Sequence, residues 1–343
     1  MTKCVQMAGL ATVIFSLAGC ASPGPPRPPS LHLVAIVDDI SATRIGPKVL
    51  LHWTTPDKTT DALEPTGHLS AIVCRVTAAK CIPVSKLAVH PGQSLTQEIL
   101  PPPLTQDPAT ILRYRVEIQN ASGRSAGLSN EALTLSGAAP EPIAHLQTRV
   151  TPKGVLLQWE KDGGLSTEIL ITRDRLTPPK PAKTQAGIKV AKEEPANTIL
   201  RATADAPGTL DPTAKFGDTY TYRATRVRTV TLNGATLQIR SEPSPATTIA
   251  VVDTFPPAPP TGLVLVPTES GPDLSWEPNT EPDLAGYFVY RRSPNAPPTK
   301  ISDLIRVPGF HDPTTPTAET KYSYSITAVD INGNESKHSE EIQ

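Results

Sequence analysis

The triplet Leu-x-Trp occurs three times in this chain, and its three copies contain every tryptophan of the protein. The copies are Leu51-His52-Trp53, Leu157-Gln158-Trp159 and Leu274-Ser275-Trp276. A spacing of two residues puts the leucine and the tryptophan of each copy on one face of a β-strand, where the large indole is expected to lie in a core. The 343 residues are therefore predicted to contain one structural unit copied three times.

Each triplet is surrounded by further runs that favour β-structure. First strands are expected at 31–34, 146–150 and 263–266, third strands at 71–76, 169–173 and 287–291, and late strands at 112–118, 220–224 and 322–328. The chain has 39 prolines and only five phenylalanines, a composition typical of short elements with many stops. This composition favours an all-β array over a helical bundle.

The combination of runs resembles the fibronectin type III domain, a seven-stranded β-sandwich with one core tryptophan on its second strand and a tyrosine leading its sixth. The similarity is closest near the end of the chain, where Pro256-Pro257 precedes the first strand. There Tyr322 takes the place of the family's corner tyrosine, whose hydroxyl caps a turn. Tyr220 takes that place in the middle copy, and Leu112 replaces it in the first. The resemblance implies three tandem fibronectin type III-like (immunoglobulin-like) β-sandwiches.

These observations divide the chain into five segments. A signal peptide is expected at 1–19 and a stalk at 20–30, followed by module one at 31–138 (divergent), module two at 141–252 and module three at 256–343. The extra residues of module two lie mainly in the proline- and lysine-rich stretch 176–183, which predicts a loop. Its Asn233-Gly234 pair predicts a tight hairpin that extends the last two strands beyond the sandwich.

The N-terminus resembles a bacterial lipoprotein signal. A basic start is followed by an apolar run over 5–18, which has the length of a signal-peptide core and is short for a membrane span. The run ends in Leu17-Ala18-Gly19-Cys20. By resemblance, the small residues before the cysteine admit the signal peptidase, and the sulfur of Cys20 is the site of lipid attachment. The alternative is an ordinary secretory signal with an unrelated cysteine.

Lipid on Cys20 would hold the mature protein at a membrane, because several acyl chains exceed the two signals that stable anchoring requires. Ala21-Ser22 follow without an aspartate, which by resemblance to lipoproteins of two-membrane bacteria implies the outer membrane. The proline-rich stretch 23–29 favours an extended polyproline stalk of ~3 Å per residue, with a disordered spacer as the alternative.

Two cysteines of the mature chain lie close together in module one. Cys74 falls within an expected strand, and Cys81 follows after a gap of six residues. Export carries a chain to an oxidising space, where a hairpin return could place the two side by side and allow a disulfide. Cross-strand disulfide geometry is demanding, so two free thiols remain the alternative.

Charge is unevenly distributed along the chain. Residues 31–140 carry 9 basic and 9 acidic side chains, 141–252 carry 15 and 11, and 253–343 carry 6 and 13. Four arginines lie around the expected hairpin of module two, and they are candidates for an anion-binding patch: Arg223, Arg226, Arg228 and Arg240. The alternative is a solvated strand face.

Signatures of catalysis, metal binding and cofactor binding are missing from the sequence. The histidines lack zinc-site spacing, and no glycine-rich phosphate loop or Gly-x-Ser-x-Gly elbow occurs. The stretch 330–335 has alternating oxygen ligands like a calcium loop, but the position of its glycine favours a hairpin turn. We therefore expect no catalytic residues, no metal, no cofactor and no enzyme activity.

The pattern as a whole predicts a lipoprotein of the bacterial cell envelope, anchored through its N-terminal lipid. Its modules are expected to bind or scaffold an envelope protein or polysaccharide, because sandwiches of this kind present loops rather than enclose deep active sites. A passive spacer or structural stalk is the main alternative, and an enzyme acting on envelope glycan or peptide is a third. Nucleic acid is not expected as a partner.

Overall fold

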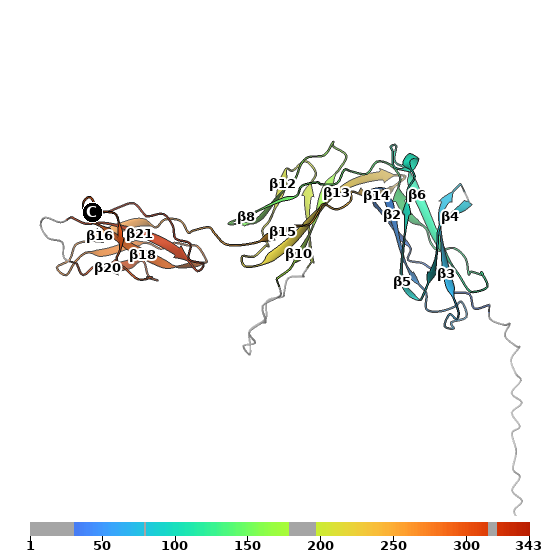
Figure 1. The fold of residues 1–343 in the computed structure, drawn as a ribbon, viewed down its shortest axis with the longest axis horizontal. Coiled ribbons are helices and arrows are strands. Elements are labelled where there is room, and N and C mark those ends of the chain that lie inside the picture. The colour runs from blue at the N-terminus through green and yellow to red at the C-terminus, as the bar shows by residue number, and fades with distance from the viewer. Residues whose placement is uncertain (1–30, 79, 178–196, 315–320) are drawn as a thin grey trace, which may run out of the picture. The chain divides into compact units, whose positions relative to one another are not determined.

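The computed structural model describes residues 31–78, 80–177, 197–314 and 321–343. The predictions for the signal peptide, the cleavage box with Cys20, the stalk and most of the 176–183 loop lie outside these ranges. In the described ranges the chain forms strands β1 to β21 and one short 3-10 helix, η1 (Pro102–Leu104), so the all-β class is confirmed (Figure 1). Within the same ranges, no helix has both the length and the apolar character needed to span a membrane.

The described residues of module three form two three-stranded sheets. One has the order β16 (Thr261–Val266), β17 (Asp273–Glu277), β20 (Gly309–His311), and the other β19 (Thr299–Lys300), β18 (Leu284–Arg292), β21 (Ser323–Asp330). Trp276 is buried between them and meets Tyr287 edge to face, with ring centroids 5.2 Å apart. After β21 the chain turns back and runs beside it, because Ser336, Ser339 and Ile342 donate backbone hydrogen bonds to β21. This strand order is that of a fibronectin type III-like sandwich.

Module two repeats this plan with a larger second sheet. The smaller sheet has the order β12 (Gly208–Asp211), β9 (Gly154–Gln158), β8 (Gln147–Thr151). The strands of the larger one are β10 (Glu168–Arg175), β11 (Asn197–Thr203), β13 (Thr219–Leu232), β14 (Ala235–Arg240) and β15 (Thr247–Ala250). Trp159 lies in the core cluster, as predicted.

The predicted hairpin of module two is present. Leu232 pairs with Ala235, and the two residues between them, Asn233 and Gly234, have φ of +51° and +81°. Positive φ at both central positions matches the turn type that fits the right-handed twist of a two-stranded ribbon. β13 therefore continues past its pairing with β10, and its last residues pair with β14 alone.

In its described residues, module one contains seven strands: β1 (Ser41–Ile45), β2 (Lys48–Thr55), β3 (Leu69–Thr77), β4 (Lys80–Val89), β5 (Gly92–Ile99), β6 (Ile111–Gln119) and β7 (Ala132–Leu135). The predicted first strand at 31–34 is wrong. In that region Val34, Val37 and Ile40 are buried at intervals of three, which does not fit the alternation of a strand. Val34 makes only an isolated bridge to Thr59.

β1 joins the extended hairpin of module two in a parallel pair, with Arg44 opposite Ile239 and Ile45 opposite Arg240. One sheet therefore runs through β11-β10-β13-β14-β1-β2-β5, with β15 added at β13. We call the contact between 42–51 and the β13–β14 hairpin the sheet junction.

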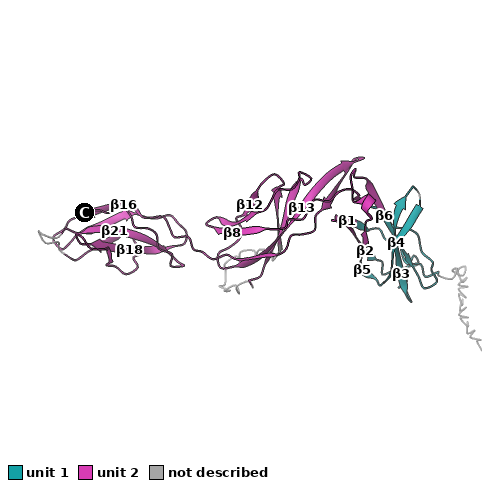
Figure 2. Cartoon of the chain, turned by 45° about the horizontal axis from the view of Figure 1, so that its top comes forward, with its two compact units in different colours: residues 1–41, 52–96, 114–132 teal, residues 42–51, 97–113, 133–343 magenta. Residues whose placement is uncertain are grey.

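The contacts of the chain divide it into two compact units (Figure 2). One unit comprises residues 1–41, 52–96 and 114–132, and the other comprises 42–51, 97–113 and 133–343. The segment 42–51 belongs to the second unit, as expected from its pairing at the sheet junction.

Candidate binding surfaces

Arg226, one of the four candidate arginines, is part of the interior of module two. Its side chain is 2% exposed, and its guanidinium donates to the backbone oxygens of Glu141 (3.0 Å) and Glu160. A buried guanidinium that is bonded to carbonyl oxygens ties β13 to the segment before β8 and to the chain that follows β9. It is not available to an anion in solution.

Arg228 lies on β13 beside the sheet junction and contacts other segments of module one. Its guanidinium lies 2.8 Å from the carboxylate of Asp107 and 2.8 Å from the backbone oxygen of Ala138. The hydrogen bond from Arg228 holds the pKa of the Asp107 carboxyl below its usual value. Arg240 lies at the same junction, where its backbone oxygen accepts from the N–H of Gly46 at 2.8 Å.

Arg223 lies on the other face of the same strand, because successive side chains of a strand alternate. It is exposed and lies 3.6 Å from Asp174. The structure therefore does not bring the four arginines together as a free anion-binding patch. Because side chains alternate between the two faces of β13, Arg223 lies on the opposite face from Arg226 and Arg228. Arg226 and Arg228 are already hydrogen-bonded within the protein.

Cys74 and Cys81 form a disulfide in the structure. Their Cα atoms are 5.3 Å apart, within the range of natural bridges. The bond links β3 to β4, whose register shifts between Val73 and Cys74, so that Cys81 lies opposite Val76. Of the two alternatives for this pair, the bridge is the one the structure contains.

A buried polar network that was not predicted holds the two sheets of module two together. Arg173 on β10 donates to Asp211 at the end of β12 (2.9 Å), and the hydroxyl of Tyr222 donates to the same carboxylate (2.9 Å). Thr213 adds its hydroxyl at 2.7 Å. Burial alone would raise the pKa of Asp211, but the bonds from Thr213 and Tyr222 and the charge of Arg173 outweigh it and lower the pKa.

Module three contains the same network. Arg291 on β18 lies 2.9 Å from Asp312, which also accepts from the hydroxyl of Tyr324 (2.9 Å) and from the N–H of Thr314 (2.9 Å). The repeated sequence Asp-Pro-Thr, at 211–213 and 312–314, is the signal that could have identified both networks. Their burial makes them structural elements rather than binding sites.

The calcium-like stretch 330–335 forms a turn. Asp330 accepts from the backbone N–H groups of Asn332 and Asn334 at 2.8 Å each, and from the amide of Asn334 at 2.7 Å. Asp253 and Asp283 bring carboxylates to within 4.8 Å of Asp330. Gly333 donates its N–H to the backbone oxygen of Asp330, and Val329 forms a bridge with Glu335, so this stretch has the hairpin turn that the sequence favours.

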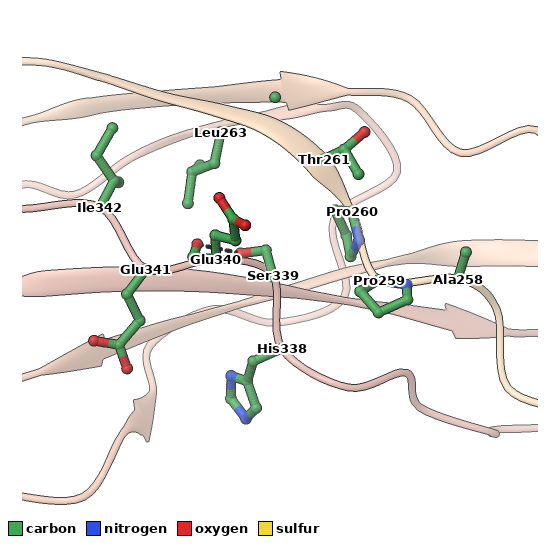
Figure 3. Close-up of a pocket in the computed structure, with 11 residues that line it drawn as sticks. Ala258, Pro259, Pro260, Thr261, Leu263, His338, Ser339, Glu340, Glu341 and Ile342 are labelled. Atoms are coloured by element: carbon green, nitrogen blue, oxygen red, sulfur yellow. Dashed lines mark hydrogen bonds between the residues drawn. The ribbon is translucent and has the colours of Figure 1, made fainter.

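An open groove of about 750 Å³ lies along one side of module three (Figure 3). One wall is the start of β16 with Pro259 and Pro260, and the other is the segment 338–342. Leu263 and Ile342 contribute apolar side chains. Figure 3 shows the carboxylate of Glu340 projecting into the space between the walls.

Comparison with known proteins adds little to this geometry. No protein-family model matches the sequence, and no curated protein does so. Among solved structures, the chain is similar to the crystal structure of the FN1–FN3 domains of chicken CNTN1, with 12% sequence identity and a TM-score of 0.26. The similarity covers 89% of this chain and 97% of the other. The fold class follows from the strand orders within the modules.

Proposed function

We propose that this protein is a lipoprotein of the bacterial cell envelope, anchored through Cys20 in the outer membrane, whose β-sandwich modules serve as a non-catalytic binding or scaffolding platform. The anchoring proposal rests on the sequence of the export signal. The platform proposal rests on the sandwich fold and on the sheet junction.

The sheet junction is the single observation that carries the scaffolding role. A scaffold must hold its parts in a fixed geometry, and flexible linkers do not do so. Here β1 and β14 share backbone hydrogen bonds within one sheet, and Arg44, 1% exposed, donates to the backbone oxygen of Gly137 beside them. A chain that acted only through independent modules would not need this buried contact.

Anchoring is tested by membrane fractionation of Cys20→Ser. Without lipid at residue 20, we expect the protein in the soluble fraction and no incorporation of labelled palmitate. Cys4→Ser is the matched control, since it changes a cysteine of the leader ahead of the proposed cleavage site and should leave the protein at the membrane. Retention of Cys20→Ser on membranes after a salt wash would place the anchor elsewhere.

The platform role is tested by cross-linking in intact cells followed by purification of the tagged protein. We expect a reproducible protein or polysaccharide partner that is lost when Trp276→Ala or Trp159→Ala unfolds a module. A passive spacer predicts a different result. In that case, an unrelated sandwich array of the same length on the same anchor should correct the defect of a strain that lacks this protein. Turnover of envelope glycan or peptide by the purified chain would instead establish an enzyme.

A further inference from the structure

The groove of module three lies between the free edges of two sheets. β16 is the outermost strand of its sheet and pairs only with β17. On the opposite wall, the segment 336–342 pairs with β21 through Ser336, Ser339 and Ile342. No further strand pairs with either wall among the residues that the structure describes.

Within its own six residues, β16 has no protection of its exposed edge apart from one irregularity of register. Its sequence, Thr-Gly-Leu-Val-Leu-Val, contains no charged residue and no proline, and Val264 and Val266 are 50% and 52% exposed. Natural proteins generally block such edges with lysine, proline, a bulge or a covering segment, because an open edge pairs with other chains. The irregular register lies between Thr261 and Val264, in the part of β16 that lines the groove, and the strand continues regularly over 264–266 next to it.

The opposite wall supplies free backbone donors and negative charge. Within the described residues, the N–H groups of Glu340 and Glu341 donate no hydrogen bond, and the Glu340 carboxylate accepts none. In Figure 3 the side chain of Glu340 points toward β16, whereas those of His338 and Glu341 point away from it. Glu341 is paired instead with Arg292. Glu340 is therefore the charge that an occupant of the groove would meet.

These features define the chemistry of an occupant. An extended peptide can satisfy backbone groups along a strand edge, and side chains at alternate positions then enter the groove. Leu263 and Ile342 favour apolar contact, and Glu340 favours a cation that has an apolar stem, such as lysine or arginine. The segment 253–343 carries 13 acidic and 6 basic residues, so the surrounding field also attracts a basic partner.

We propose that the groove between β16 and 338–342 binds an extended, basic peptide segment of a partner protein as an added β-strand. This inference deepens the proposed binding role of the platform and rests on it. The added strand covers the exposed edge of β16, and a basic side chain of the partner pairs with Glu340.

The probe is a labelled octapeptide of alternating lysine and valine, added to the full mature chain carrying Cys20→Ser for solubility. We expect binding by fluorescence anisotropy that weakens at least tenfold when glutamate replaces lysine in the peptide, because the groove is acidic. Methylation of alternate backbone nitrogens of the peptide should remove binding, since it blocks strand pairing. Hydrogen–deuterium exchange should slow at 261–266 and 338–342 when the peptide is present.

Glu340→Lys should weaken binding at least tenfold. Glu269→Lys, an equal change of charge at an exposed residue that does not line the groove, is the matched control and should bind like the parent. Equal binding of the methylated peptide, no protection at the two walls, or an unchanged affinity of Glu340→Lys would each overturn the proposal. If these fail while cross-linking in cells still captures a partner, the platform role stands and only the groove is excluded.

Discussion

The guanidinium of Arg173 lies 2.9 Å from the carboxylate of Asp211, with the two side chains 3% and 0% exposed. Because β10 and β12 belong to different sheets, this ion pair links the two layers of module two through its core. The Arg291–Asp312 pair does the same in module three at the same distance, but Arg291 is 25% exposed. The same arginine–aspartate pair therefore links the two sheets in both modules, and its arginine is more exposed in module three.

Asp211→Ala is expected to destabilise module two by ~3–5 kcal/mol, because it leaves a buried guanidinium without its charge partner. Urea unfolding followed by Trp159 fluorescence, in a chain whose other two tryptophans are phenylalanine, measures the effect. The control is Glu168→Ala, which breaks an ion pair with the 65%-exposed side chain of Arg201 and should cost only ~0–1 kcal/mol. Equal effects of the two substitutions would contradict the prediction.

Acid should destabilise module two through the same carboxylate. The pKa of Asp211 is lowered in the folded state, so its contribution to stability is present above the unfolded value of about 4 and is lost as the pH falls through the folded pKa. Asp211→Asn removes this titration. Its free energy of unfolding should therefore vary less with pH below about 4 than that of the parent. Parallel pH profiles for the two chains would show that Asp211 does not contribute.

The Arg228–Asp107 contact should tie the segment before β6 to β13 of module two, beside the sheet junction. The two side chains are 17% and 42% exposed, so the interaction is screened and a coupling energy of ~0.5–1 kcal/mol is expected. A double-mutant cycle with Arg228→Ala and Asp107→Ala, read from the Trp159 transition, measures it. The coupling should decrease as salt is raised. Strict additivity at low salt would mean that the contact does not hold the junction.

Local patterns were sufficient to predict much of the fold. The second, third and late strands of each module lie where alternation placed them, and Asn233-Gly234 predicted its hairpin because only a few residue pairs adopt positive φ at two successive positions. All three tryptophans are buried, at 1%, 7% and 5% exposure for Trp53, Trp159 and Trp276. Each of these features depends on residues close together in the sequence.

The features that sequence reasoning missed depend on distant contacts. The roles of Arg226 and Arg228 follow from partners up to 121 residues away, and charge counting cannot distinguish a buried arginine from a solvated one. The pairing of β1 with β14 is also non-local. The apolar run 31–34 resembled a strand, but the chain there buries Val34, Val37 and Ile40 at intervals of three. The Asp-Pro-Thr repeat was visible, but its meaning required the arginine and tyrosine of neighbouring strands.

Gly154 should tolerate no side chain, because its position combines an unusual backbone conformation with close contact to the Asp211 loop. Its φ is +126°, and a Cβ atom there would overlap the backbone oxygen of Asp211. Gly154→Ala is therefore expected to destabilise module two by at least ~2 kcal/mol. Gly163→Ala is the matched control in the same module, since a Cβ there meets nothing within 4 Å, and it should change stability by no more than ~0.5 kcal/mol. The Trp159 unfolding transition compares the two, and coincident midpoints would show that β9 can move away from Asp211 at little cost.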